Sequence, residues 1–205
     1  MNFTRSICLL FISVLMSAFC YATSADELKD LHQQAVNAYS ANDLATLKVV
    51  FNKVFTQYSK NTKADLTPFY MLRAKYFKAL SQNKSAENDV DTVLKYSPKT
   101  SDAYLLKIEF IKDAESQIAL LQKGIDLIDQ DEPLRKQAAM IKIGMISSYW
   151  DMKQYNSEPF NKDEAYKQYP VAKGACNDLL QLTATDQEAM ELYKKKCKIE
   201  DIKNF

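Results

Sequence analysis

Residues 67–100 read TPFYMLRAKYFKALSQNKSAENDVDTVLKYSPKT, and this stretch decides the fold. Apolar residues recur at helical spacing on both sides of the polar break SQNKS. Pro68 opens the first apolar segment and Pro98 follows the second, which are positions where helices begin and end. A new helical segment starts close behind, at Asp102. The stretch therefore predicts a helical hairpin followed by a tight joint.

The sizes of the side chains suit close packing of this hairpin. Ala74 and Ala86 are small, so they would let its two helices approach each other. Tyr70, Phe77 and Leu94 are large, and we expect them to fill the gap to the next hairpin.

The chain beyond residue 26 has helical apolar spacing almost throughout. Its 205 residues include only 3 Gly and 5 Pro, which suits long helices better than many short strands. Pro68, Pro98 and Pro133 are spaced by 30 and 35 residues, a period typical of helix–turn–helix repeats. The sequence contains no alternating strand pattern of convincing length, and we predict an all-α fold.

Residues 67–100 resemble a tetratricopeptide repeat (TPR) in the sizes of the residues at the family's positions. Those positions are taken by Tyr70, Ala74, Phe77, Ala86, Val90 and Pro98. Val93 departs from the family, which usually has Ala there. Further repeats are expected at about 28–61, 101–134 and 135–183, with Gly124 as a small residue of the third, and 186–199 would be a cap helix. The resemblance implies antiparallel helical hairpins stacked as a short TPR-like solenoid with a C-terminal cap helix. An irregular helical bundle is the alternative.

The first 25 residues have the three-part pattern of a secretory signal peptide. Arg5 precedes the apolar run SICLLFISVLMSAF, and the small residues Ala22 and Ala25 follow it. We predict a signal peptide over 1–22, with cleavage after 25 as a close alternative, and a single TPR-like domain over 26–205. The apolar run is short for a membrane anchor, and a bulky Phe19 disfavours a lipoprotein at Cys20. The protein is then exported, to the periplasm or as a secreted protein, with no membrane span after signal removal.

Loss of the leader removes Cys8 and Cys20 and leaves Cys176 and Cys197 as an even pair. In an oxidising compartment such a pair suggests one disulfide. Straight antiparallel helices would separate the two Cα atoms by about 7–8 Å, at the limit for bonding, so a tilted crossing would be needed. The alternative is two separate buried thiols.

No catalytic constellation is recognisable, and we predict a protein that is not an enzyme and needs no cofactor or metal. His32 is the one histidine, Cys-x-x-Cys does not occur, and the glycines stand alone. Carboxylates such as Asp113 and Asp131 lie near predicted helix ends, where capping explains them. The balance of 27 basic against 26 acidic residues excludes a large field for nucleic acid. A carboxylate site assembled by folding is the enzymatic alternative.

The TPR resemblance implies a concave face lined by the first helix of each repeat, which would hold a peptide or a partner helix. Carried over to this sequence, the groove positions are His32, Val36, Tyr39, Met71, Lys75, Lys78, Leu105, Glu109 and Lys112. The chaperone-type groove that clamps a terminal carboxylate is not matched, because Met71 and Lys75 stand where it needs other side chains.

Six aromatic residues gather over residues 149–169: Tyr149, Trp150, Tyr155, Phe160, Tyr166 and Tyr169. We expect them to pack over the open end of the stack, with Trp150 and Tyr155 the most core-like. Aromatic side chains also dominate binding hot spots, so Tyr155, Phe160, Tyr166 and Tyr169 are alternative binding residues. The protein would then be an inhibitor or immunity-type protein that binds a toxin through this insertion.

Overall fold

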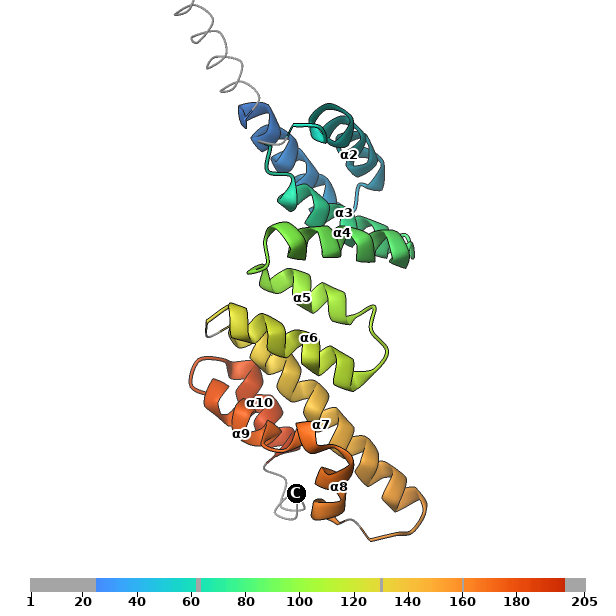
Figure 1. The fold of residues 1–205 in the computed structure, drawn as a ribbon, viewed down its shortest axis with the longest axis vertical. Coiled ribbons are helices and arrows are strands. Elements are labelled where there is room, and N and C mark those ends of the chain that lie inside the picture. Colours follow the sequence, from blue (N-terminus) through green and yellow to red (C-terminus); the bar gives the residue numbers. More distant parts are fainter. Residues whose placement is uncertain (1–24, 62–63, 130, 160, 198–205) are drawn as a thin grey trace, which may run out of the picture. The chain divides into compact units, whose positions relative to one another are not determined.

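The computed structural model describes residues 25–61, 64–129, 131–159 and 161–197, and over these residues it is all-α, without strands (Figure 1). The predicted fold class is confirmed. A first helix spans 25–40. It is followed by α2 (Leu44–Tyr58), α3 (Thr67–Ala79), α4 (Asn83–Tyr96), α5 (Ser101–Ile108), α6 (Ala114–Leu127), α7 (Glu132–Tyr155), α8 (Lys162–Gln168), the 3₁₀ turn η1 (Pro170–Ala172), α9 (Ala175–Leu182) and α10 (Gln187–Lys196). The predicted signal peptide lies outside the described residues.

The chain divides into two compact units, with the boundary between Val93 and Leu94 inside α4. Each is described by itself. In the described part of the chain, no helix has the length and apolar character needed to cross a membrane.

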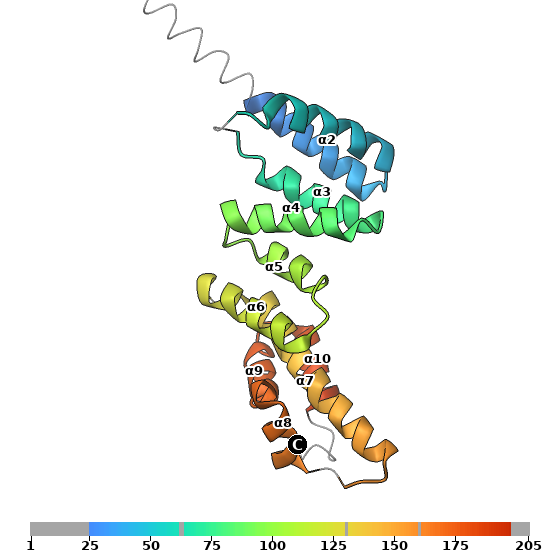
Figure 2. The same cartoon turned by 45° about the vertical axis from the view of Figure 1, so that its right-hand side comes forward.

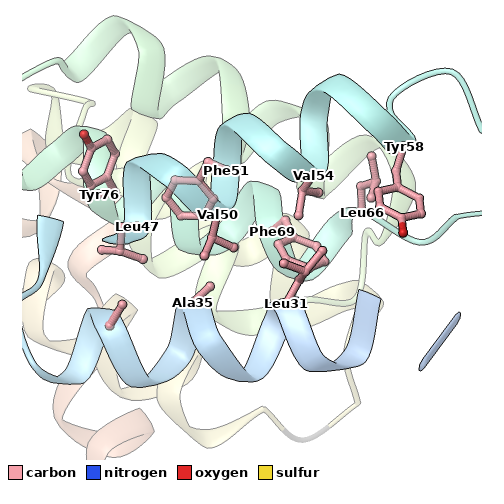
Figure 3. Packing of buried hydrophobic residues seen from close by; sticks show 11 residues of the cluster. Leu31, Ala35, Leu47, Val50, Phe51, Val54, Tyr58, Leu66, Phe69 and Tyr76 are labelled. Atoms are coloured by element: carbon pink, nitrogen blue, oxygen red, sulfur yellow. The ribbon is translucent and has the colours of Figure 1, made fainter. Parts of the chain in front are cut away.

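The first unit is built around the hairpin of the first helix and α2. Leu31 and Ala35 of the first helix face Leu47, Val50 and Val54 of α2 (Figure 3). These positions follow the three-and-four spacing of one helix face, as the helical apolar spacing beyond residue 26 predicted. Phe69 of α3 is 2% exposed and joins the same core.

The second hairpin, α3 and α4, contains the two small residues that the sequence analysis singled out. Ala74 and Ala86 are both fully buried. Tyr70 and Phe77 pack against the core of the preceding hairpin, where the Tyr70 ring lies 4.9 Å from that of Phe55. Leu94 packs in the second unit with the core around Tyr104.

Aspartates fix where several helices begin. Asp43, Asp113, Asp131 and Asp186 are the N-caps of α2, α6, α7 and α10, and each side chain accepts a hydrogen bond from a backbone N–H in the first turn. Capping was predicted for Asp113 and Asp131, and it is confirmed. Because α6 is capped at Asp113, the helix before it ends early, and α5 has only 8 residues.

The second unit is organised along α7, a helix of 24 residues. Its N-terminal half packs against α6 on one side and α9 on another, and α10 packs on α9 (Figure 2). Lys142 pairs with Asp178 of α9 at 3.1 Å. The C-terminal half carries Ile146 and Tyr149, which pack with Ala165 of α8 and Ala172 of η1.

Cys176 of α9 and Cys197, the C-cap of α10, form the predicted disulfide, with 5.8 Å between their Cα atoms. The bond fastens the last helix to the hairpin that it closes.

Gly124 of α6 lies in tight contact with the core of the second unit. A Cβ atom at this position would lie 2.7 Å from Leu134 Cδ1 and 3.0 Å from Tyr104 Cγ. Leu134 is 0% and Tyr104 1% exposed, so neither side chain can turn outward into solvent to relieve the contact. Only a glycine lets α6 lie this close to its neighbours.

We expect Gly124→Ala to destabilise the protein by about 1–3 kcal/mol, because overpacking outweighs the better helix propensity of alanine. Gly144→Ala is the matched control, since a Cβ there meets nothing within 4 Å and the residue is exposed in the middle of α7. It should stabilise by about 0.5–1 kcal/mol. Urea unfolding followed by circular dichroism measures both. Equal effects of the two substitutions would contradict the steric account.

Asp186 caps α10 and also forms an ion pair with Lys136 of α7. Its carboxylate lies 2.8 Å from Lys136 Nζ, and this hydrogen bond, followed by the one from the Ala189 N–H, lowers the pKa of Asp186. The pKa of Lys136 is raised, first by Asp186 and then by Glu188.

A lowered carboxyl pKa contributes stability above its unfolded value of about 3.9 and loses it as the pH falls through the folded value. We therefore expect Asp186→Asn, which keeps a capping side chain, to be less stable than the native chain at neutral pH. The difference should shrink and vanish as the pH falls through the lowered pKa of Asp186 in the folded state. Urea midpoints measured over a pH series test this, and a difference independent of pH would show that the ion pair is not its cause.

Candidate functional site

A cleft of about 480 Å³ lies in the first unit between α2 and α3, and we call it the aromatic cleft. Its volume is within the range of small-ligand and side-chain pockets. Its lining residues are Lys48, Phe51, Asn52, Phe55, Thr56, Arg73, Tyr76, Phe77, Leu80 and Gln82.

Helical spacing explains why these residues share one cleft. The α2 residues recur at intervals of three and four, beside the core stripe of Leu47, Val50 and Val54, and those of α3 follow the same rule. Where the two faces meet, Phe51 and Tyr76 pack edge to face with 5.6 Å between ring centroids. Figure 3 shows both side chains beside the core of the first hairpin.

Arg73 is the most constrained polar residue of the aromatic cleft. Its guanidinium carbon lies 3.7 Å from the centroid of the Phe55 ring and 5.6 Å from that of Phe77. Its Nε and Nη2 atoms each donate a hydrogen bond of 2.7 Å to the carboxylate of Asp89 on α4. Among the described residues, Asp89 is the one charged residue that is buried. The cleft therefore holds a guanidinium fixed by an aromatic face and a two-point ion pair.

Apolar surface lies open beside this guanidinium. Leu80, the C-cap of α3, is 37% exposed, and Phe55 and Phe77 are half-buried. Lys48 is exposed on α2 and takes part in no ion pair within the described residues. The arrangement offers an apolar contact next to positive charge.

The groove positions predicted in the first unit have mixed surroundings. His32 is half-buried, with its ring edge-on to Phe69 at 5.5 Å, so it is not simply a solvated residue. Val36, Met71 and Lys75 are half-buried, and Tyr39 and Lys78 are exposed.

In the second unit, Leu105 is half-buried against the core that contains Tyr104, while Glu109, the C-cap of α5, and Lys112 are exposed. These three predicted groove residues therefore belong to one short helix and the loop after it.

The aromatic insertion 149–169 is largely packed, as expected. Tyr149 is 5% exposed, and its ring meets that of Tyr169 edge-on at 6.3 Å. Tyr166 is half-buried in the same cluster, and burial raises its pKa. Trp150 is half-buried. Phe160 lies outside the described residues.

The expectation that Tyr155 is core-like is wrong, because this residue is 91% exposed. Tyr155 ends α7, beyond the last turn that α8 and η1 cover. Met152, one turn earlier, is 45% exposed. The free end of α7 therefore presents two large apolar side chains to solvent.

The described residues contain no group of three side chains that could together hold a metal ion. Asp43, Asp113 and Asp186 are carboxylates whose pKa values are lowered, in each case first by a side-chain hydrogen bond. The pKa of Glu27 is also lowered, first by a hydrogen bond from Lys53 and then by one from Tyr58. The hydrogen bond to Glu27 raises the pKa of the Tyr58 phenol to about 12. These shifts accompany helix caps and ion pairs.

Comparison with protein-family models, with curated proteins and with solved structures found no match for this chain.

The aromatic cleft was not predicted from the sequence. The signal was present as a second face of α2, where Lys48, Asn52 and Phe55 recur at helical spacing beside the core stripe. What could not be read from spacing was that α3 would place Arg73 against that face.

Proposed function

We propose that this protein is an exported, non-enzymatic adaptor that binds another protein, and that the aromatic cleft is its binding surface. The observation that carries the proposal is the fixed Arg73 beside open apolar side chains at Phe55, Phe77 and Leu80. Arginine and aromatic residues are the types that contribute most to protein-binding energy. The proposal includes a signal peptide over 1–22 and a periplasmic or secreted location.

A TPR-like arrangement of the hairpins is part of the same proposal. It is supported by the paired helices, by the burial of Ala74 and Ala86 at the family's small positions, and by the shortness of the joints. Helical repeats of this kind act by presenting a surface to a partner segment rather than by chemistry. The predicted groove residues of the first unit, from His32 to Lys78, would then form a second face of the adaptor.

The free end of α7 favours a second candidate, an inhibitor or immunity-type protein that binds through the insertion 149–169. Tyr155 and Met152 support it, because exposed large apolar residues close together mark interaction sites.

Affinity capture of the full-length chain, as its host processes it, tests these alternatives. Leu80→Asp places a charge in the aromatic cleft, and Tyr155→Asp does so at the end of α7. Val49→Asp is the matched control, because Val49 is on α2, 68% exposed, and does not line the cleft. Circular dichroism first establishes that all variants are folded.

A partner held by the native chain and by Val49→Asp but lost by Leu80→Asp is the expected result. A partner lost only by Tyr155→Asp would move the binding surface to the insertion. A partner held equally by all variants would contradict both surfaces and leave the groove residues, tested by Lys75→Glu. Cell fractionation and N-terminal sequencing of the purified chain check export and cleavage.

A further inference from the structure

We infer that the aromatic cleft recognises an acidic segment of its partner, in which a side-chain carboxylate stands next to a large apolar side chain. The inference rests on the proposed function, since it names the chemistry of the partner that the same cleft would bind.

The aromatic cleft is lined by positive charge. Its lining residues include two cations, Lys48 and Arg73, and no aspartate or glutamate. Asp89 lies behind Arg73, with a side chain only 7% exposed, and it occupies the Nε and Nη2 atoms. The Nη1 atom keeps its hydrogens for another acceptor, because a guanidinium has five N–H donors. Lys48 adds a second positive charge that no acid in the described residues pairs with.

Arg73 is held in a fixed position before any partner binds. An arginine free in solution loses rotamer freedom when it binds a ligand, and that loss weakens binding. Arg73 has lost this freedom in the folded protein, because Phe55 supports one face of its guanidinium and Asp89 holds one edge. A carboxylate that contacts it meets a donor already in place.

Apolar side chains beside Arg73 favour a peptide over a small anion as the ligand. Phe77 and Leu80 follow Arg73 along α3 by one and two turns and line the same cleft. A bare anion such as phosphate would leave their apolar surface exposed to water. A leucine or phenylalanine next to an acidic residue would bury that surface and so stabilise the complex. The combination favours an acidic–apolar segment within a chain rather than a free terminal carboxylate.

The test uses a fluorescent peptide in which Glu and Leu residues are interspersed, with its C-terminus amidated so that only side-chain carboxylates are present. Control peptides replace every Glu by Lys, or every Leu by Ser. Each is titrated with the full chain, and fluorescence anisotropy gives the dissociation constant at two salt concentrations. Lys48→Glu is compared with Lys29→Glu, which changes the net charge equally on an exposed residue of the first helix outside the cleft.

We expect the Glu–Leu peptide to bind, the Lys–Leu peptide not to bind, and added salt to weaken the complex. Lys48→Glu should weaken binding roughly three- to tenfold, as expected when an exposed attractive charge becomes repulsive, and Lys29→Glu by less than about twofold. Leu80→Ala should weaken the Glu–Leu peptide but not the Glu–Ser peptide.

No binding of the Glu–Leu peptide, or equal effects of Lys48→Glu and Lys29→Glu, would overturn the inference. Competition by inorganic phosphate with loss of any Leu dependence would reassign the cleft to a small anion. Tighter binding of the Lys–Leu peptide, still weakened by Leu80→Ala, would overturn the acidic preference and leave the proposed function standing. The proposed function has its own test: if the Leu80→Asp variant still captures the partner, the cleft is not the binding surface.

Discussion

Arg73→Ala is expected to destabilise the first unit by about 3–5 kcal/mol, the cost of leaving a buried charge without its partner. Asp89 has a side chain only 7% exposed, and in the native chain its carboxylate accepts two hydrogen bonds from Arg73. The substitution also uncovers the face of Phe55 on which the guanidinium lies. Urea unfolding measures the loss, and hydrogen exchange of the α3 and α4 amides assigns it to this unit.

Two controls separate burial from charge. The pair Lys84–Glu87 lies on the same helix as Asp89, but the Lys84 side chain is 82% exposed, so Lys84→Ala should change the stability by less than about 0.5 kcal/mol. The double variant Arg73→Met with Asp89→Leu removes both charges and should recover most of the stability, because apolar residues replace buried ion pairs well. A loss below about 1 kcal/mol for Arg73→Ala would show that the pair behaves like an exposed one.

Removal of the disulfide by Cys176→Ser with Cys197→Ser should cost the second unit roughly 3 kcal/mol, the loop-entropy value for a closed loop of this size. The two cysteines are 21 residues apart in sequence. The core of Leu179, Leu182 and Ala189 remains, so the double variant should fold in a weakened form. Urea unfolding with and without reductant measures the change, and hydrogen exchange of α10 should show the largest loss of protection.

The native chain in reductant should match the double variant, and reductant should leave the variant unchanged. A native chain that keeps its unfolding midpoint after complete reduction, verified by thiol titration, would contradict the predicted contribution of the bond.

Local signals in the sequence predicted the helices and their ends. The prolines and the apolar spacing predicted where the hairpins lie. Asp113 and Asp131 were predicted to cap helices, and they are the N-caps of α6 and α7. The disulfide was predicted from the sequence with two separate thiols as the alternative, and the structure shows the bond. The helices and their caps depend on residues close together along the chain.

Features that depend on how helices meet were not predictable in the same way. Arg73 and Asp89 are 16 residues apart on different helices, and nothing in their spacing selects Asp89 over the other acids of α4. Tyr155 belongs to a run of aromatics that is otherwise packed, and its exposure depends on where α8 and η1 stop covering α7.

The tight contact at Gly124 couples the substitutions that this protein can accept at 124 and 134. A larger residue at 124 is unfavourable while Leu134 and Tyr104 keep their present size and position. A smaller residue at 134 would relieve the 2.7 Å contact, but Tyr104 would remain 3.0 Å from the new Cβ and the shortened side chain would leave a cavity in the core. Either substitution made alone therefore lowers the stability, and the two positions are expected to change together or not at all.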